Sequence, residues 1–480
     1  MKLFKRALNF FGGGIGRNSY ENAQTTSSRG TPQNPTPTDE KFVLDSPTRT
    51  ELMRRARWCE KNSGIILSVL KDFKIYGVGR GVYPTPQTDD ADWNRKAYEH
   101  FYRWAKTPDY SGRFTWREIQ NMATHLKKID GEFFAIKCFD AFGNPKIQLV
   151  ESHRLGSVSS NYDIEKGNYI SDGVEFDKNG RVVAYHFRIG EDFKTKRYLA
   201  KSVIHVYEAT RPSGTRAHSE VQHSINEIID RKEIVALEKK KVKAISDIVG
   251  VIKGTSKGPS QDFQVAGTES EQAQTDVRTI NRIMGGKNIR ISPDENYDFK
   301  TPTTPSSTFN GFTRDIDRTA HLGIEPYEMT NPTEIGGAGV RLICAKTQRY
   351  IDADSFTLDE KFYSKVWFFV IGCAIDNGDL PPMKWWWDVN WTHPKKLTVD
   401  AGRDGQNERA DIDMGLKSVR QNYQEAGLSF EDEIENRAKD FALVKEIADK
   451  YGVDFSLLYK PQGAQVVLTT QQSNNNENEK

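Results

Sequence analysis

Apolar positions recur at helical spacing between a polar N-terminal arm and residue 130. This spacing predicts helices because residues three and four apart share one helix face. Asp45 or Ser46 suits the N-cap of the first, with Pro47 at the first helical position. Thr115 and Glu118 have the spacing of a capping box, which opens the last. The expected helices cover residues 46–76, 92–106 and 115–128.

From residue 131 to residue 207 the pattern changes to an alternation with a period of two. Alternation predicts strands, because successive side chains of a strand point to opposite faces. Residues 182–189 alternate in this way, and Asp177-Lys-Asn-Gly180 before them has the composition of a hairpin turn. The pattern predicts a small antiparallel β module.

Helical spacing returns from residue 219 onward. The longest helical pattern, 340–376, would span about 55 Å at 1.5 Å per residue, more than most globular domains need. Pro381-Pro382 ends it, and two or three helices follow near the C-terminus. The expected elements of this half are helices over 219–247, 307–321 and 340–376, a short strand at Ile289 to Ile291, a strand over 384–391, and the helices within 404–458.

Charge narrows the classes of function. The 480 residues carry 68 basic and 66 acidic side chains, a formal net charge of +2. A histone-like surface that grips phosphate broadly is therefore excluded. A protein that guides DNA without gripping it is still compatible, because a gripping surface would resist translocation. No apolar run approaches the roughly 20 residues of a membrane span, and residues 1–39 and 461–480 have the composition of disordered segments.

Several motifs of enzymes are approached but not completed. Gly285-Gly-Lys287 is followed by Asn288, so the P-loop pattern fails, and Gly77-Val-Gly79-Arg-Gly81 lacks dinucleotide-binding spacing. His218 and His223 are five apart, which does not stack them as metal ligands on a helix. The four cysteines form no CxxC pair. We therefore expect no enzyme activity, metal or cofactor.

Two clusters have alternative interpretations. Lys239-Lys-Lys-Val-Lys243 on an expected helix is either a solvated face or a positive patch for nucleic acid or an acidic partner. Trp385–Trp387 with Trp391 could stack on bases. The stronger interpretation of the tryptophans is a strand packed against the long helix or a neighbouring subunit.

The order of motifs over roughly residues 45–458 resembles the lambda family of phage portal proteins. No single motif is specific, and their order and spacing carry the resemblance. The matching stretches are Arg54-Arg-Ala-Arg57 with Ile75-Tyr-Gly-Val-Gly79; Phe114-Thr-Trp-Arg-Glu118 with Asp130-Gly-Glu132; His205-Val-Tyr207 with Arg211-Pro-Ser-Gly-Thr-Arg216; Gly323-Ile-Glu-Pro326-Tyr-Glu; Arg341; and Trp391 with Pro394, Asp400, Ser418 and Gly427.

The chain departs from the family's pattern at three points. Gly337-Ala-Gly-Val340 stands where the family tends to have Tyr-Ser-Ser before the arginine. Asp400-Ala401 replaces an Asp-Pro pair, and Asn62-Ser-Gly64 replaces Asn-Asn-Pro. The first departure limits the transfer of side-chain roles at the narrowest part of the channel.

The resemblance implies an α+β portal fold in a ring, usually of twelve copies. Its wing, stem and crown would be mainly helical, with the small antiparallel β module in the wing, an α/β clip and the long helix at about 340–376. The implied regions are an N-terminal arm, 1–39; wing, 40–218 and 340–400; stem helices, 219–247 and 307–322; clip, 248–306; tunnel loop, 323–339; crown, 401–460; and tail, 461–480.

The resemblance also places candidate residues. A mobile tunnel loop with glycines and two prolines would reach the channel's narrowest point, where glutamates would repel phosphate. Its residues are Glu325, Pro326, Glu328, Asn331, Pro332, Glu334, Gly336, Gly337, Gly339 and Arg341. The stem residues that would face DNA or a partner are Lys239, Lys240, Lys241, Lys243, Arg314 and Arg318.

The expected function is therefore a conduit for double-stranded DNA at one capsid vertex, in the virion and, during assembly, in the host cytoplasm. Expected partners are further copies of the chain, the terminase large subunit, the major capsid and scaffolding proteins, and a head-completion adaptor, with no membrane. One alternative is a nuclease or recombinase, which would need clustered carboxylates that the sequence does not show. A monomeric scaffold or adaptor is the other.

Overall fold

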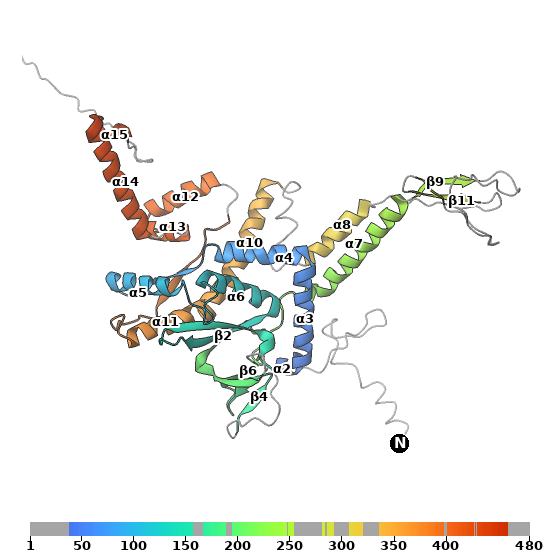
Figure 1. Cartoon of the computed structure of the whole chain (residues 1–480), viewed down its shortest axis with the longest axis horizontal. Coiled ribbons are helices and arrows are strands. Elements are labelled where there is room, and N and C mark those ends of the chain that lie inside the picture. Colours follow the sequence, from blue (N-terminus) through green and yellow to red (C-terminus); the bar gives the residue numbers. More distant parts are fainter. Residues whose placement is uncertain are drawn as a thin grey trace, which may run out of the picture.

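The computed structural model describes residues 38–156, 167–188, 194–246, 248–253, 281–283, 286–291, 307–319, 336–397, 401–426, 428 and 430–458. Within these ranges the protein is an α+β fold of helices around small sheets (Figure 1). Residues 1–37 of the arm, most of the clip, residues 320–322 of the second stem helix, residues 323–335 of the tunnel loop and the chain from 459 lie outside them.

The N-terminal helices follow the sequence pattern closely. Asp45 caps α3 by accepting from the Thr48 backbone amide, and the capping box of Thr115 and Glu118 is formed at the start of α6. The helices are α2 (Glu40–Val43), α3 (Ser46–Asn62), α4 (Gly64–Asp72), a π-helical turn η2 (Phe73–Val78), α5 (Ala91–Trp104) and α6 (Trp116–Asp130). The helices expected over 46–76 are thus α3, α4 and η2, and the extended backbone of Ser63 separates α3 from α4.

The β module consists of two antiparallel sheets, as the alternation predicts. One has the order β3-β2-β8 and the other β4-β5-β6-β7. Gly180 has φ of 81°, as a turn between β5 and β6 requires. The strands are β2 (Glu132–Phe139), β3 (Pro145–Glu151), β4 (Tyr169–Ser171), β5 (Val174–Phe176), β6 (Val182–Arg188), β7 (Thr195–Leu199) and β8 (Val203–Tyr207).

Two helices, α7 (Ile225–Ser246) and α8 (Ser307–Thr319), pack together and project from the body (Figure 1). At their outer end lies a three-stranded sheet of β9 (Ile248–Lys253), β10 (Asn281–Ile283) and β11 (Gly286–Ile291), which includes the strand expected at Ile289 to Ile291. The inner end of α7 is anchored, because Ile225 and Ile228 are buried against α3 and α4.

The long helix expected over 340–376 is present as a continuous helical run. It comprises α10 (Gly337–Leu358), a π-helical turn η7 (Asp359–Tyr363) and α11 (Ser364–Asp376). It begins three residues earlier than expected, with Gly336 at the N-cap. The start of α10 is exposed, whereas α11 crosses the main core.

The strand expected over 384–391 is shorter than the pattern suggested. Lys384 to Trp387 form a turn in which Trp385 has φ of 60°, and only β12 (Val389–Thr392) pairs, with β1 (Tyr83–Pro86). Contacts with α11 fix the position of Trp386. Its ring stacks on Phe368 with centroids 4.8 Å apart, and its backbone carbonyl accepts a hydrogen bond from Trp367 Nε1 at 3.0 Å. Packing against α11 therefore overrides the alternation of a strand. Trp391 confirms the packing interpretation, because it joins the core beside Tyr363.

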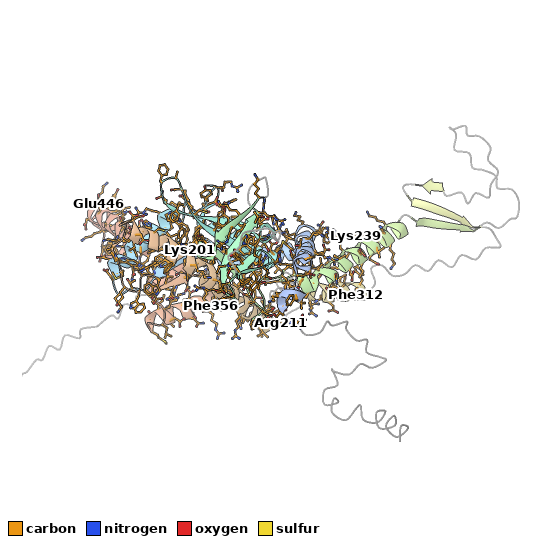
Figure 2. The ribbon with its side chains drawn as sticks, turned by 90° about the horizontal axis from the view of Figure 1, so that it is seen from below. Lys201, Arg211, Lys239, Phe312, Phe356 and Glu446 are labelled. Atoms are coloured by element: carbon orange, nitrogen blue, oxygen red, sulfur yellow. The ribbon has the colours of Figure 1, made fainter. Side chains whose placement is uncertain are left out.

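The C-terminal part is helical, with four helices among the described residues. They are α12 (Ala401–Asp413), α13 (Val419–Glu425), α14 (Phe430–Tyr451) and α15 (Phe455–Leu458). They extend away from the body, at the end opposite to the α7–α8 pair (Figure 1). Figure 2 shows the same separation, with Glu446 far from Lys239 and Phe312.

The main core lies between α5, α6, sheet β3-β2-β8 and α11. Aromatic rings dominate it: Trp116 contacts Phe101, Phe362 and Tyr363, with ring centroids 5.5 to 5.8 Å apart. One smaller core lies beneath α3 and α4, and another lies between the two sheets.

Candidate functional surfaces

The expected stem cations lie on the projecting pair. Lys239, Lys240 and Lys243 are exposed on the outer half of α7, and Lys241 lies 3.6 Å from Glu238. Their position near the C-terminal end of a helix also complements the helix dipole, which supports the solvated-face interpretation. The structure therefore leaves both interpretations of the lysine cluster open.

The two arginines expected to face DNA on α8 are partly engaged within the pair. Arg318 lies 3.5 Å from Asp315 on its own helix, and Arg314 is half-buried. Arg231 on α7 donates to Asp317 on α8 at 3.0 Å, so an ion pair joins the helices. Charge here contributes to holding the pair together.

Only some of the residues expected in the tunnel loop belong to the part of the chain that the structure describes. Glu325, Pro326, Glu328, Asn331, Pro332 and Glu334 lie outside it. Gly336 has φ of −61°, open to any residue, and Gly337, Gly339 and Arg341 are helical in α10. The expectation of a glycine-rich loop as far as 339 is therefore wrong at its end, because α10 begins there.

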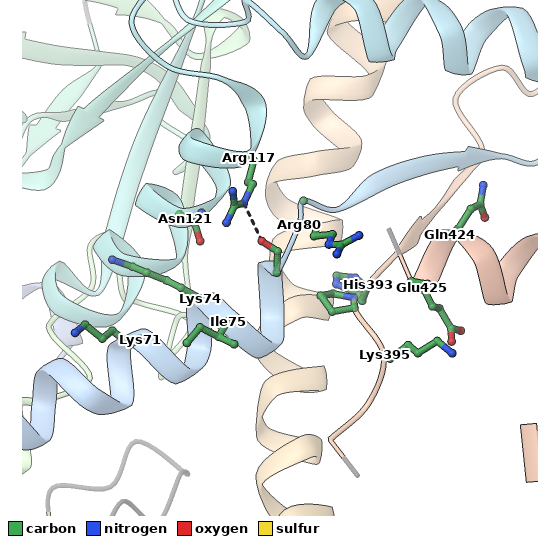
Figure 3. A pocket seen from close by; sticks show the side chains of 14 residues that line it. Lys71, Lys74, Ile75, Arg80, Arg117, Asn121, His393, Lys395, Gln424 and Glu425 are labelled. Atoms are coloured by element: carbon green, nitrogen blue, oxygen red, sulfur yellow. Dashed lines mark hydrogen bonds between the residues drawn. The ribbon is translucent and has the colours of Figure 1, made fainter. Parts of the chain in front are cut away.

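A cleft of about 800 Å³ lies where four separate segments of the chain meet (Figure 3). We call it the Gly79 cleft. Lys71 and Lys74 come from α4 and η2, Arg80 from the turn after η2, and Arg117 from α6. The remaining lining residues are Ile75, Gly79, Gly81, Asn121, His393, Pro394, Lys395, Gln424, Glu425 and Ala426.

Glycine at position 79 brings the walls of the cleft together. Gly79 has φ of 53°, and a Cβ there would lie 2.8 Å from Pro394 Cγ. Arg117 Nε donates to the Gly79 carbonyl at 2.8 Å (Figure 3). In the lining, His393 Nε2 lies 2.8 Å from Asp359 Oδ2. Burial opposes charge on the imidazole, but this hydrogen bond raises the pKa of His393.

A buried ion cluster ties the long helix to the base of the projecting pair. Lys127 Nζ lies 2.5 Å from Asp354 Oδ1 and 3.2 Å from Glu220 Oε1, and Lys128 Nζ lies 2.8 Å from Asp354. Burial disfavours the Lys127 charge, but Asp354 and Glu220 outweigh it and raise the pKa of Lys127. The cluster thus joins α6, α10 and the segment leading into α7.

A second buried cluster joins the two sheets to α3. Arg216 donates to Glu132 Oε1 through Nε at 2.8 Å, and His205 Nε2 lies 3.0 Å from Glu132 Oε2. Burial disfavours the Glu132 carboxylate, but the charge of Arg216 and the hydrogen bond with His205 lower its pKa. Arg49 on α3 reaches Asp172 at 2.6 Å. Arg216, the last residue of the quoted Arg-Pro-Ser-Gly-Thr-Arg motif, therefore acts in packing.

The described residues contain neither a candidate metal site nor a helix that could span a membrane. They contain no group of three or more His, Cys, Asp or Glu side chains placed to hold a metal ion. They also include no helix long and apolar enough to cross a membrane.

Residues 29–330 match the family model described as "Phage portal protein, lambda family". The chain belongs to the lambda family of phage portal proteins. The match spans more than half of the chain and agrees with the resemblance drawn from the motifs. A portal, or connector, role follows from family membership. Portal proteins are structural components rather than enzymes.

The fold of this portal protein is also similar to chains in solved particles. The neck of an empty gene transfer agent particle computed with C6 symmetry has a TM-score of 0.43 and 12% identity, with 79% of this chain and 93% of that chain covered. The neck of the native particle with C12 symmetry has a TM-score of 0.43 and 11% identity, covering 80% and 95%. No curated protein sequence matches this chain.

The Gly79 cleft of the portal protein was not predicted from the sequence. Four of its cations, Lys71, Lys74, Arg80 and Arg117, are separated by other residues in the sequence, so no contiguous charge run marks them. The available signal was the Val78-Gly-Arg-Gly81 turn, which overlaps the Ile75-Tyr-Gly-Val-Gly79 stretch of the resemblance. That turn presents Arg80 to the cleft.

Proposed function

We propose that this portal protein assembles into a closed ring at one capsid vertex, through which double-stranded DNA is packaged and later ejected. The observation that carries the proposal is the projecting α7–α8 pair with a sheet at its tip, in a chain of the portal family. Such a pair buries little surface within one chain and buries more when neighbours pack beside it in a ring.

The ring would be built from the regions that the resemblance implies. The body with the β module and the long helix is the wing, α7 and α8 are the stem, and β9 to β11 belong to the clip. The helices α12 to α15 are the crown. The tunnel loop would occupy the residues between α8 and α10, with Glu328 and Glu334 repelling phosphate.

The clip would dock the terminase large subunit before packaging and a head-completion adaptor afterwards, and the wing would contact major capsid and scaffolding proteins. A small sheet at the end of two long helices suits exchangeable partners, because it stands clear of the body (Figure 1). The protein would reside in the virion at the portal vertex and in the host cytoplasm during assembly.

Particle mass tests the ring. A ring of about twelve copies of the 54.6 kDa chain has a mass of roughly 650 kDa, which mass photometry resolves from a monomer or dimer. Electron micrographs of the same sample should show a central channel. Monomers or two-fold dimers under all salt conditions would contradict the proposal.

Deletion within the clip tests docking separately. Removing residues 259–275 should leave rings intact and block packaging, because this segment falls in the proposed clip, between β9 and β10 in the sequence. A deletion of equal length from the N-terminal arm, residues 18–34, is the control for chain length. Normal packaging by the clip deletion would refute the docking assignment.

A further inference from the structure

The Gly79 cleft carries an excess of positive charge. Among the described residues, no carboxylate lies within ion-pair distance of Lys71, Lys74, Arg80 or Arg117. The net charge of the whole chain is only +2, so this local excess does not follow from composition.

The other charged groups of the lining are already paired. Lys395 Nζ lies 3.0 Å from Glu408 Oε2, and Glu425 Oε2 lies 2.5 Å from Lys417 Nζ. His393 is paired with Asp359. Glu60 acts on Lys74 only at longer range, and burial lowers the pKa of Lys74 despite it. The charge available to a ligand in the cleft is therefore cationic.

The cations are carried on constrained backbone. Arg80 lies between Gly79 and Gly81, both at positive φ, and the turn is fixed to Pro394 and to the Arg117 side chain. Guanidinium and ammonium groups held on such elements are suited to phosphate oxygens, since less side-chain freedom is lost on binding. A volume of about 800 Å³ exceeds what one inorganic phosphate fills, and suits part of a longer polyanion.

The position of the cleft indicates which polyanion. Helix α4, the exposed start of α10 and the C-terminal helices lie on one side of the molecule, and sheet β4-β5-β6-β7 lies on the other (Figure 1). In the proposed ring the start of α10 follows the tunnel loop, so this side faces the channel. The cleft then lies on the channel wall between wing and crown.

We propose that the Gly79 cleft binds the phosphate backbone of double-stranded DNA on the channel wall, an inference that rests on the proposed ring function. The contact is independent of sequence, because phosphate contacts position a duplex without reading its bases. Only a few cations per subunit act, so each contact is weak enough to release as the duplex moves.

The test compares two triple variants as full-length rings. K71A/K74A/R80A removes three cleft cations, and K178A/R181A/K201A removes three exposed cations from the β module and its edge, with Lys201 visible in Figure 2. Binding of a short fluorescent duplex is followed by anisotropy over a salt series. Mass photometry of each sample reports ring formation.

We expect the cleft variant to bind the duplex about tenfold or more weakly at low salt. The slope of log affinity against log salt should fall by about 0.9 for each phosphate that the variant no longer neutralises. The control variant should match the parent. Equal behaviour of the two variants, or no duplex binding by parent rings, overturns the inference. Intact parent rings in either case leave the proposed ring function standing.

Two further measurements sharpen the result. R80A alone changes one exposed side chain and serves if the triple variant does not fold; it should also weaken binding and lower the salt slope. Competition with polyglutamate separates the ligand classes. If the cleft variant loses polyglutamate binding while keeping duplex affinity, the cleft is a site for an acidic protein segment and the DNA assignment is wrong.

Discussion

Helices α11 and α14 show how differently two regions of this chain use apolar side chains. In α11, Val366, Trp367 and Val370 are fully buried in the main core. In α14, Phe441 and Leu443 remain 46% and 55% exposed. The body therefore completes its own core, whereas the C-terminal helices expose large apolar surfaces that a neighbouring subunit would cover.

The same contrast divides the charged groups. Buried ion clusters around Asp354 and Glu132 hold the body together, whereas the ion pairs of α14, such as Lys439 with Glu435, lie at the surface. A buried pair is costly to break, because the remaining charge has no solvent, while surface pairs contribute little. Stability within one chain should therefore depend on the body, and assembly on the projecting helices.

The largest effect should come from breaking the cluster between α6 and α10. D354A leaves Lys127 and Lys128 buried with only two partly exposed partners, Glu220 and Glu208, and should cost about 3–5 kcal/mol of unfolding free energy. D352A, two residues away and exposed, is the matched control and should change stability by less than about 0.5 kcal/mol. Urea denaturation measures both, and similar midpoints would contradict the burial argument.

Acid should weaken the β module next. The hydrogen bond from Arg197 lowers the pKa of Glu175 to about 2, although burial opposes it. A lowered carboxyl pKa contributes stability that is present above the unfolded value, about 4.3, and lost as pH falls toward 2. The contribution is on the order of 3 kcal/mol. E175Q should flatten the stability profile between pH 4.5 and about 2; an unchanged profile would exclude Glu175 as the titrating group.

Capping substitutions compare the regions directly. T115A removes the capping box of α6, and S418A removes the side-chain cap of α13, which accepts from the Gln421 amide at 3.1 Å. Each should cost about 1 kcal/mol. In T115A the loss should appear in global unfolding, because α6 crosses the core; in S418A hydrogen exchange should quicken only within α12 to α15. Global destabilisation by S418A would show that the C-terminal helices fold with the body.

The smallest effect on stability, and a large one on assembly, is expected at the exposed face of α14. L443E should change the unfolding free energy by less than about 0.5 kcal/mol, because Leu443 is already half exposed. Ring formation should nevertheless fall, since a charge would then face the neighbour. E446K is the control on the same helix, and mass photometry measures the outcome. Normal rings from L443E would place the subunit contact elsewhere.

Much of the local structure was predictable from the chain. The cap at Asp45, the capping box at Thr115, the hairpin turn ending at Gly180 and the long helix all rest on residues a few positions apart. The stacked tryptophans were not predictable in this way, because the turn at Trp385 depends on Phe368 and Trp367 in a helix that lies earlier in the chain.

The family could likewise be predicted from the sequence, since the order and spacing of the motifs are informative even though no single motif is specific. The two candidate surfaces differ in whether the sequence reveals them. The lysine cluster of α7 is contiguous and was visible, whereas the cations of the Gly79 cleft are drawn from α4, the following turn and α6. No periodicity relates these segments.

The sequence by itself determined most of the secondary structure, the modest net charge and the family, because capping, periodicity and composition act over short distances. Only the tertiary structure decided which charges are paired. It buries Lys127 and Lys128 against Asp354, and it leaves Lys71, Lys74 and Arg80 without a carboxylate among the described residues. The physical reason is that an ion pair depends on distance in space, and a lysine has the same sequence signature whether its nearest neighbour is a carboxylate or an open cleft.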